Sequence, residues 1–539
     1  MIIWFCYSLT RSRLILLSEE RELGMNAETG SLGEHRRKSE YGLLSTENLL
    51  AFSVIILCLA LFFGPYTRFL QQTDTYAKWF YSIQNYRHQY RENARLCEWA
   101  YMEFFYRVMG EPQHYRAFHV CVGIAVDAVV TFLLWKVICR GCRIRERGLR
   151  LAVLLPAIML RANVFYSDIF QYGVDTAPMF LGDLLAVWSA LTLTGCFCRR
   201  SRILAVLLLA FSLMFRQTCL FWFVFTGLFL AFCETEKEDL AGFLRRIIPL
   251  VVTALLSALP VLLLINFWAP DGSRGSISSI DLIQSLIYFR TTFRSLLYDC
   301  CGVQPPWFYT CLLVLAILMN TVLCLRISQK EHAASGFILL LKEWIVVCGV
   351  TAGTFFTVLF VLQLPHRTTY GFATLLPLWL LFPVRYREYW EFRRGKLLPV
   401  LSACLLFLNL AVNYRYTHLI YECLAETNCV DQEEARYYYS LIQQYEEETG
   451  TEITKLAWHY DEDFTQYLPD VIGAKTINMR AYSTTWSRRE IFPFTVGRRF
   501  RIVHFDKELY QQYFAGKDWD GPSEEQLLFL DDTVYIVLY

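Results

Sequence analysis

The sequence predicts an α-helical protein that crosses a membrane about eleven times and ends in a small α/β domain. Apolar stretches of about 17–22 residues recur through the first three quarters of the chain, and each is long enough to cross roughly 30 Å of hydrocarbon as a helix. The composition agrees, since 55% of the 539 residues are hydrophobic and 16% are aromatic. From about residue 414 the chain becomes polar. We therefore expect an N-terminal segment (1–47), a membrane domain (48–413) and a C-terminal domain (414–539).

The predicted spans are read from the hydrophobic segments, and the fifth and tenth are short for a bilayer. They are 48–66, 118–138, 150–166, 180–198, 203–217, 219–233, 247–267, 307–326, 344–363, 371–384 and 397–413.

Lys and Arg gather in alternate connections, which predicts the orientation of the chain. They are frequent in 139–150, in 199–202, before 247, in 326–330 and in 385–396. The connection at 166–177 has none. Because cytoplasmic loops carry the excess of Lys and Arg, we expect the N-terminus inside the cell and the C-terminal domain outside. The basic residues HRRK at 35–38 agree.

Residues 1–24 resemble a signal peptide poorly, because the apolar part precedes the arginines, and Met25 is an alternative start to Met1.

Charge and cysteine usage exclude some classes of function. The formal net charge is +1, which gives no reason to expect a nucleic-acid partner. Most of the 18 cysteines fall in apolar segments, where Cys is a small hydrophobic residue, and the CRGC sequence at 139–142 stands alone among arginines. No metal site and no cofactor are predicted.

Arg216 lies within the apolar sequence LMFRQTCLFWFVF and is followed by Gln217 and Thr218. The predicted topology places this Arg at the outer membrane surface, between the fifth and sixth spans. It either extends its guanidinium to the interface as an anchor, or binds an anion such as a lipid phosphate.

The first outer loop, about 67–117, carries apolar side chains at helical spacings. These are Trp79, Phe80, Ile83, Trp99, Phe104 and Phe105. The pattern predicts two amphipathic helices lying in the membrane interface. Asp74 is the only acid between the first span and these helices. It is either the N-cap of a helix or a carboxylate available for catalysis.

Two further outer connections supply charged residues. FYSDIFQYGVDTAPM contains Asp168 and Asp175, which either solvate a turn or act chemically, and LPHRTTYGF contains His366, Arg367 and Tyr370. His366 and Arg367 are otherwise interfacial anchors. Arg161 comes from another span. Collected on one face, a carboxylate can take a proton from a hydroxyl while Arg and His hold a phosphate. Asp127 and Asp183 lie within spans and are expected to face protein rather than lipid.

The chain resembles the GT-C superfamily, integral-membrane glycosyltransferases that use polyprenyl-phosphate sugars, over about residues 48–413. FRQTCLFW resembles the Arg-Gln-Thr segment of dolichyl-phosphate-glucose glucosyltransferases of the endoplasmic reticulum. RENARLCEWAYMEFFYRVMG resembles the Gly-Arg-x-Leu stretch of bacterial O-antigen-modifying (Gtr-type) glucosyltransferases, and FQYGVDTAPMFLGDLLAV the Phe-x-Tyr segment of the same group. Ala94 replaces the Gly of that stretch, which puts a role for Arg95 in doubt.

The resemblance implies transfer of a hexose, most readily glucose, from a polyprenyl-phosphate sugar to an extracytoplasmic glycan or lipid-linked acceptor. Asp74 matches the first-loop acid that acts as base or orients the acceptor, and Arg216 matches the Arg of the Arg-Gln-Thr segment. His366 and Arg367 match only loosely. Arginines would stabilise the lipid phosphate as it leaves, without a nucleotide or an obligatory metal. The sequence contains no Asn-x-Ser/Thr site, which favours a bacterial cell membrane over the endoplasmic reticulum.

The tail and the rival functions complete the prediction. DQEEARYYYSLIQQYEEETG predicts a helix that ends at Gly450, and ITKLAWHY, FRIVHF and TVYIVLY predict strands.

The rival functions are a transporter or flippase of a lipid-linked sugar and a polysaccharide polymerase or ligase. Transporters commonly show repeated halves and charges at the midplane. No repeat is seen and the acids lie at the outer edge, so the enzyme is preferred.

Overall fold

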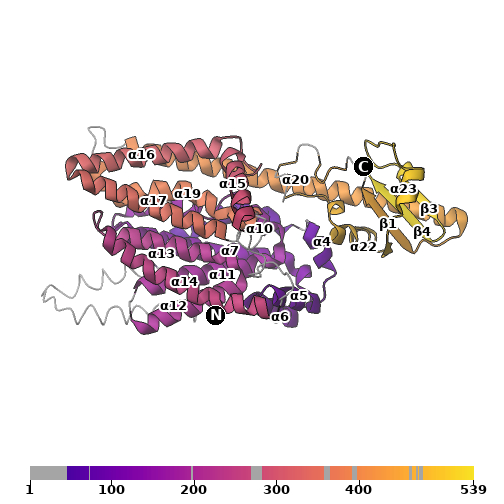
Figure 1. The fold of residues 1–539 in the computed structure, drawn as a ribbon, viewed down its shortest axis with the longest axis horizontal. Helices are drawn as coiled ribbons and strands as arrows, with labels where there is room; N and C mark the ends of the chain where they lie inside the picture. The colour runs from indigo at the N-terminus through magenta and orange to yellow at the C-terminus, as the bar shows by residue number, and fades with distance from the viewer. Residues whose placement is uncertain are drawn as a thin grey trace. The chain divides into compact units, whose positions relative to one another are not determined.

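Helices dominate the computed structural model of the protein, and a small sheet lies near the C-terminus (Figure 1). The structure describes residues 45–68, 70–71, 73–195, 198–268, 282–356, 365–390, 397–460, 464–468, 471–472 and 477–539. Among these residues, seven helical segments are long and apolar enough to cross a membrane. The chain is therefore a polytopic helical membrane protein. Residues 1–44, which include HRRK and Met25, lie outside the described residues.

The seven long segments contain α3 (Thr46–Phe63), α7 (Arg116–Gly141), α11 (Thr176–Gly195), α13 (Leu220–Glu234), α14 (Leu240–Trp268), α16 (Phe308–Lys330) and α17 (Ala333–Phe355). Each corresponds to one predicted span. The other helices of this part of the chain are α4 (Thr73–Trp79), α5 (Ile83–Glu92), α6 (Leu96–Met109), α8 (Arg147–Ala152), α9 (Leu154–Met159), α10 (Tyr166–Gln171), α12 (Arg199–Phe215), α15 (Leu282–Asp299), α18 (His366–Thr369) and α19 (Leu375–Arg385).

Four predicted spans are short or irregular, so eleven remains a predicted number. Residues 203–217 form α12, 371–384 form a 3₁₀ turn and α19, and 397–413 begin the long helix α20 (Leu397–Thr449). Residues 150–166 do not form one helix but the short helices α8 and α9 followed by turns. Pro156 contributes no N–H donor to this region, and the buried Val164 N–H donates to Asn413 Oδ1 at 2.9 Å instead of to a helical carbonyl.

Helix α17 begins eleven residues before the predicted span, because Lys342 and Glu343 lie inside it and lower its hydropathy. Both side chains are buried and hydrogen-bonded, although Glu343 Oε1 has no partner among the described residues. Asn320 donates to Glu343 Oε2, and Lys342 Nζ donates to Thr235 Oγ1 and to the Glu236 carbonyl at 2.8 Å each. The C-terminal end of that predicted span, 357–363, lies outside the described residues. Helix α15, which carries Arg290 and Arg294, was not predicted at all, since its hydropathy is too low.

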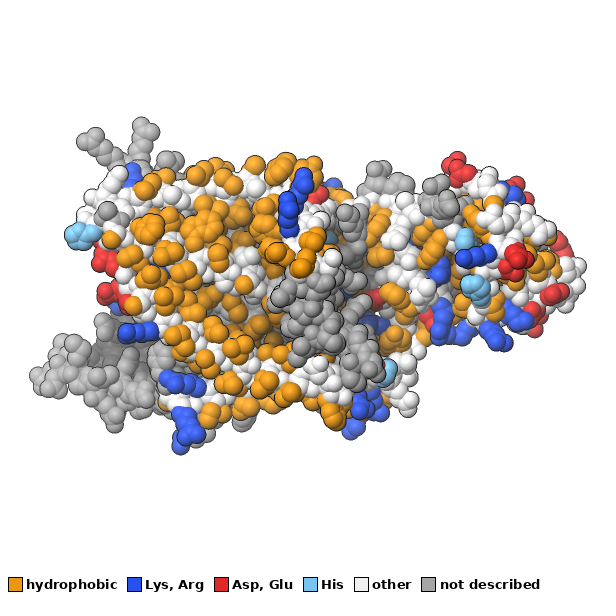
Figure 2. All heavy atoms as spheres, viewed as in Figure 1, with side chains coloured by type: hydrophobic (Ala, Val, Ile, Leu, Met, Phe, Trp, Pro, Cys, Tyr) orange, Lys and Arg blue, Asp and Glu red, His pale blue; other side chains and the backbone are white. Residues whose placement is uncertain are grey.

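The surface of the helical bundle is apolar. Figure 2 shows hydrophobic side chains covering the visible face of the bundle, while charged groups gather mainly toward its ends and over the sheet. Helix α14 contributes Leu255, Leu263 and Phe267, which are 62–79% exposed. Such a continuous exposed apolar surface is what a lipid environment requires.

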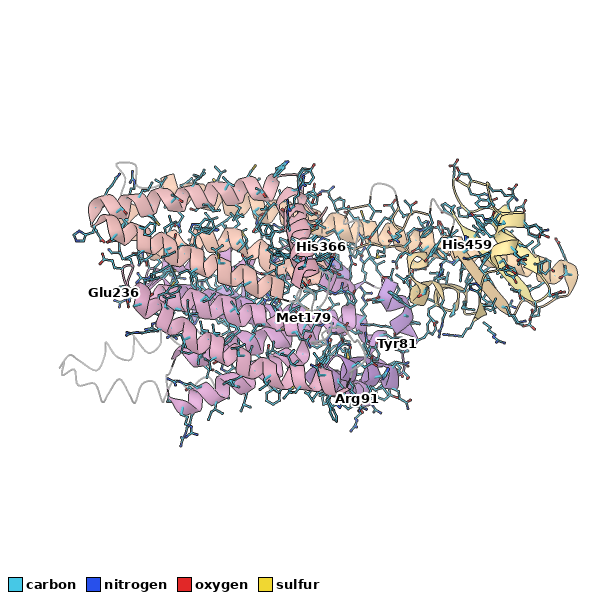
Figure 3. All side chains as sticks on the ribbon, in the orientation of Figure 1. Tyr81, Arg91, Met179, Glu236, His366 and His459 are labelled. Carbon is cyan, nitrogen blue, oxygen red and sulfur yellow. The ribbon has the colours of Figure 1, made fainter. Side chains whose placement is uncertain are left out.

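Basic connections meet at one end of the bundle. A polar cavity of about 1070 Å³ there is lined by residues 142–143, 145–146, 236–238, 330–332 and 385–388. Glu236 marks this end and Tyr81 lies at the other (Figure 3). The structure thus brings together four connections that the sequence assigns to one side. That this side faces the cytoplasm remains a prediction, and residues 391–396 of the last connection lie outside the described residues.

The first outer loop forms three helices rather than the two predicted. A turn at 80–82 separates α4 from α5, and Ala94 separates α5 from α6 because it adopts the left-handed conformation with φ 51°. Glycine adopts this conformation without strain. Residue 94 therefore has a backbone conformation that suits Gly.

One 53-residue helix, α20, runs from the bundle to the sheet and passes through the predicted domain boundary at 413/414. It ends before Gly450, which has φ 70°. The sheet has the order β2-β1-β4-β3, in which β2 (Arg501–Val503), β1 (Lys455–Tyr460) and β4 (Thr533–Leu538) are parallel, and β3 (Leu527–Leu530) is antiparallel to β4. The predicted helix end and three strands are present; β3 was missed.

Alternate strand residues build the core of this C-terminal region. Leu456 of β1 and Ile536 of β4 pack with Tyr438 and Ile442 of α20, while Ala457 faces a second cluster on the other side of the sheet. This alternation follows from the period of two in a strand. The short helices here are α21 (Thr485–Arg488), α22 (Ile491–Val496) and α23 (Lys507–Tyr513). Whether this region is a domain outside the membrane remains a prediction.

Candidate functional site

A polar cavity of about 480 Å³ lies at the end of the bundle opposite the basic connections. Its walls come from α4, from α5 and the turn after it, from residues around the start of α11, from the ends of α12 and α18, and from α21. It is lined by Asp74, Ala77, Lys78, Tyr81, Gln89, Glu92, Asn93, Arg95, Tyr172, Asp175, Arg216, Arg367 and Trp486. Five of the predicted site residues therefore meet in one cavity.

Asp74 is held by two neutral donors. It lies in the first turn of α4, which begins at Thr73, so it is inside the helix rather than its N-cap. The Tyr172 hydroxyl donates to Asp74 Oδ2 at 3.1 Å, and Trp486 Nε1 donates to Oδ1 at 3.0 Å. Lys78 follows one turn later on the same face of α4, as the spacing of four residues requires. Asp74 is thus fixed in direction while its side chain lines the cavity.

Asp175 is the centre of a buried charge network. It accepts from Lys78 Nζ at 2.7 Å and from the Tyr90 hydroxyl at 3.0 Å, and it forms an ion pair with Arg216 at 3.0 Å. Three groups, from α4, α5 and the end of α12, therefore converge on this one carboxylate of η3 (Gly173–Asp175). A carboxylate bound by two cations is a poor proton acceptor, so its role is to position Lys78 and Arg216.

Arg216 is also bound to Glu98 of α6. The distance from Arg216 Nη2 to Glu98 Oε1 is 3.2 Å, and Arg95 Nη1 lies 3.6 Å from the other Glu98 oxygen. Burial raises the pKa of the Glu98 carboxyl, and the charges of Arg216 and Arg95 oppose that rise. Arg216 is only 9% exposed, so it is not an interfacial anchor extended into water.

Asp168 positions Arg367 and does not line the cavity. It is fully buried, accepts from the Arg367 backbone N–H at 2.9 Å and lies 3.2 Å from Arg367 Nη1. The Arg367 guanidinium lies 4.7 Å from the centre of the Tyr172 ring, and Lys78 Nζ lies 5.3 Å from the same ring centre. Tyr172 therefore contacts two cations with its ring and Asp74 with its hydroxyl.

Three other predicted residues support the site from behind. Gln217 donates to the Asn93 carbonyl at 3.0 Å and so ties η4 (Gln217–Cys219) to the turn after α5. Tyr370 is buried, donates to the Thr218 carbonyl at 3.0 Å and stacks on Tyr166. His366 is buried beside Phe165, and burial lowers its pKa, which favours the neutral imidazole. None of these three lines the cavity.

Arg161 lies inside the bundle and not in the cavity. It is fully buried, forms an ion pair with Asp183 at 2.7 Å, and donates to Asp127. Its guanidinium lies 4.7 Å from the ring centres of both Tyr166 and Trp222. The prediction that Asp127 and Asp183 face protein is confirmed. Their shared partner gives Arg161 a structural role, since its charge compensates two buried carboxylates.

Lys78, Glu98, Tyr172 and Trp486 belong to the site but were not predicted. Lys78 is recognisable in the sequence as the residue four positions after Asp74. Glu98 and Tyr172 lie three residues from the predicted site residues Arg95 and Asp175, but nothing in the sequence marks them as part of a site. Trp486 lies 412 residues from Asp74, and only the fold brings them together.

The arrangement combines three carboxylates, those of Asp74, Glu92 and Asp175, with a set of cations. Lys78, Arg95, Arg216 and Arg367 line the same cavity as Asp74. Among the residues that the structure describes, no group of three or more His, Cys, Asp or Glu side chains is placed to hold a metal ion. Such a site can accept a proton and bind an anion. No protein-family model, curated protein or solved structure matches the chain, so the function has to be inferred from these residues.

Proposed function

We propose that the protein is a GT-C-type membrane glycosyltransferase of a bacterial cell membrane, which moves a hexose from a polyprenyl-phosphate sugar to a glycan or lipid-linked acceptor outside the cell. One observation carries the proposal. The Asp74 carboxylate is held by Tyr172 and Trp486 in a cavity that also contains four cations, at the end of a membrane bundle. These are the groups that transfer from a lipid phosphate requires.

In the proposed reaction Asp74 takes the proton of an acceptor hydroxyl. The hydroxyl oxygen forms a bond to the anomeric carbon as the bond from that carbon to the phosphate oxygen breaks. The electron pair leaves with the polyprenyl phosphate, whose negative charge grows. Hydrogen bonds from Tyr172 and Trp486 fix the carboxylate, so little reorganisation is needed during the proton transfer.

Cations of the cavity would stabilise the leaving phosphate. Arg216 and Arg95 each have an Nε donor that is without an acceptor among the described residues, although both side chains also contact Glu98. Arg367 is 23% exposed and reaches the cavity from α18. Carboxylates behind these cations hold them in place, and the phosphate would bind those N–H groups of Lys78, Arg95, Arg216 and Arg367 that face the cavity.

Arg216→Lys is expected to raise the KM for a polyprenyl-phosphate sugar and to lower turnover by about tenfold or more. Lys retains the charge but cannot contact Asp175, Glu98 and a phosphate together, because it lacks the planar fork. Steady-state kinetics of the purified protein in lipid nanodiscs would measure the change. Arg91→Lys, a substitution in α5 outside the cavity lining, serves as the matched control. Unchanged kinetics in Arg216→Lys would exclude phosphate binding by Arg216.

The proposed topology has eleven spans. Seven are the long apolar segments, and the other four are the segment at 150–166, α12, α19 and the first part of α20. A cysteine at Lys517, an exposed residue after α23, should react with a membrane-impermeant maleimide in intact cells. A cysteine at Arg145, in the opposite cavity, should react only after permeabilisation. Both are introduced after replacement of the exposed native cysteines. The reverse pattern would show that the C-terminal region faces the cytoplasm.

The second candidate is a transporter or flippase of a lipid-linked sugar. The observation that favours it is the buried Arg161 with Asp127 and Asp183, since ionisable groups inside a membrane bundle often mark a pathway. A proteoliposome assay separates the two functions. Sugar appearing on a soluble acceptor supports transfer, whereas movement of an intact lipid-linked sugar across the bilayer without transfer supports transport. A polymerase or ligase would instead lengthen or attach a whole glycan, which product size reveals.

A further inference from the structure

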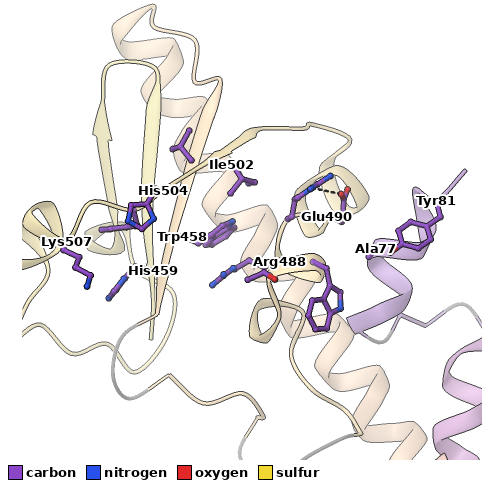
Figure 4. Close-up of a pocket in the computed structure, with 14 residues that line it drawn as sticks. Ala77, Tyr81, Trp458, His459, Arg488, Glu490, Ile502, His504 and Lys507 are labelled. Carbon is purple, nitrogen blue, oxygen red and sulfur yellow. Dashed lines mark hydrogen bonds and ion pairs between the residues drawn. The ribbon is translucent and has the colours of Figure 1, made fainter. Parts of the chain in front are cut away.

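A second cavity lies between the sheet and α4. It has a volume of about 630 Å³, within the range of about 300–1,000 Å³ usual for sites of small organic ligands. Its floor is formed by the ends of the adjacent parallel strands β1 and β2 and the residues that follow β2. In open sheets of this kind, ligands bind at the carboxyl ends of the strands. In Figure 4, Trp458 and Arg488 lie in the middle of the lining. Lys507 and His459 lie on one side of them, and Ala77 of α4 and Tyr81 of the turn after α4 lie on the other.

The lining combines flat aromatic rings with long side chains that donate hydrogen bonds. Tyr81, Trp458, Trp486 and Phe505 supply the rings, and Arg488, Arg489 and Lys507 supply donors. Trp486 is 50% exposed, an unusual position for the largest apolar side chain. Sugar rings have an apolar C–H face and a rim of hydroxyls. Aromatic rings pack on the C–H face of a sugar, and N–H donors bind its hydroxyls. This lining therefore fits a carbohydrate.

The two cavities share a wall. Ala77, Tyr81 and Trp486 line both of them. The ring of Trp486 lines the second cavity while its Nε1 donates to Asp74 in the first, at 3.0 Å. A chain bound in the second cavity would therefore lead directly to the carboxylate that accepts the proton.

We propose that this second cavity is a carbohydrate-binding subsite, which holds the glycan part of the acceptor next to Asp74. The assignment of the bound chain as the acceptor rests on the proposed function, whereas the binding of carbohydrate does not. Trp486 then has two separable roles. Its ring contacts the glycan, and its N–H orients Asp74.

The test uses the full-length protein in nanodiscs, applied to an array of defined bacterial and synthetic oligosaccharides and followed by a titration with the tightest binder. Trp486→Leu and Arg488→Gln should each raise its Kd by about tenfold or more, as removal of a binding anchor does. Tyr513→Leu and Arg501→Gln change an exposed aromatic and an exposed Arg of the same region outside the cavity. These controls should retain the wild-type Kd.

Trp486→Phe separates the two roles. It keeps a ring but loses the N–H, so the Kd should stay within a few-fold of wild type while the transfer rate falls. Absence of any bound oligosaccharide, or a Kd that neither Trp486→Leu nor Arg488→Gln changes, would overturn the subsite even if transfer occurs. Binding that depends on both residues in a protein without transferase activity would keep the carbohydrate site and reject the proposed function.

Discussion

Asp74→Asn is expected to slow sugar transfer by at least about a hundredfold while the protein stays folded in the membrane. General-base catalysis is typically worth about 10²–10⁴ in rate, and Asn cannot accept the proton. The substitution keeps the size of the side chain, and the amide oxygen can still accept one of the hydrogen bonds from Tyr172 and Trp486. Transfer of radiolabelled sugar from a polyprenyl-phosphate donor, measured at saturating donor, reports the change.

Glu103→Gln provides the matched control for Asp74→Asn. Glu103 lies in the same outer loop and pairs with Arg87 at 2.7 Å and Arg107 at 3.0 Å on the surface, away from the cavity. Surface pairs contribute little, so this variant should remain active. An active Asp74→Asn together with an inactive Asp168→Asn would move the base to Asp168. In that case the contacts of Asp168 with Arg367 would have to break during the reaction.

Arg161→Met is expected to be among the most destabilising single substitutions, with a loss of about 3–5 kcal/mol. Among the described residues, Arg161 is the only cation that forms ion pairs with both Asp127 and Asp183. Its replacement by Met leaves two buried carboxylates without a neutralising charge, and these repel each other. Thermal unfolding of the purified protein and its yield from membranes would both measure the loss.

A rescue experiment distinguishes this structural role from donor binding by Arg161. Asp127→Asn and Asp183→Asn combined with Arg161→Met remove all three charges, and the triple variant should regain most of the lost thermal stability. Removal of a complete buried charge cluster is often close to neutral. A stable Arg161→Met protein that loses only its affinity for the sugar donor would show instead that Arg161 contacts the phosphate.

The sequence predicts the long helices well because lipid imposes a single requirement on them. A stretch that buries no polar group and is long enough to cross is recognisable without knowledge of its neighbours. The failures occur where neighbours decide the structure. Residues 150–166 are apolar enough for a span but break into short helices around Pro156. Helix α17 extends through Lys342 and Glu343, which hydrogen-bond to Thr235 and Asn320 respectively.

The candidate site was predicted as a set of loops rather than as a geometry. Asp74, Arg216 and Arg367, which the predicted topology places at one membrane surface, do meet in one cavity. Their partners decide what each can do, and these are not readable from spacing. Nothing near Arg216 in the sequence shows that Glu98 will bind it. The N–H group that donates to the Asp74 carboxylate belongs to Trp486, near the other end of the chain.

Helix α20 has a mechanical consequence for the protein. Its 53 residues contain no Gly, and its only Pro, Pro399, lies in the first turn, so the sequence contains no hinge between bundle and sheet. At 1.5 Å per residue the helix is a rod of about 80 Å. A tilt of about 5° at the bundle end would displace the far end by about 7 Å if the helix stays straight. Rearrangement of the bundle around a bound donor would thereby be amplified at the sheet.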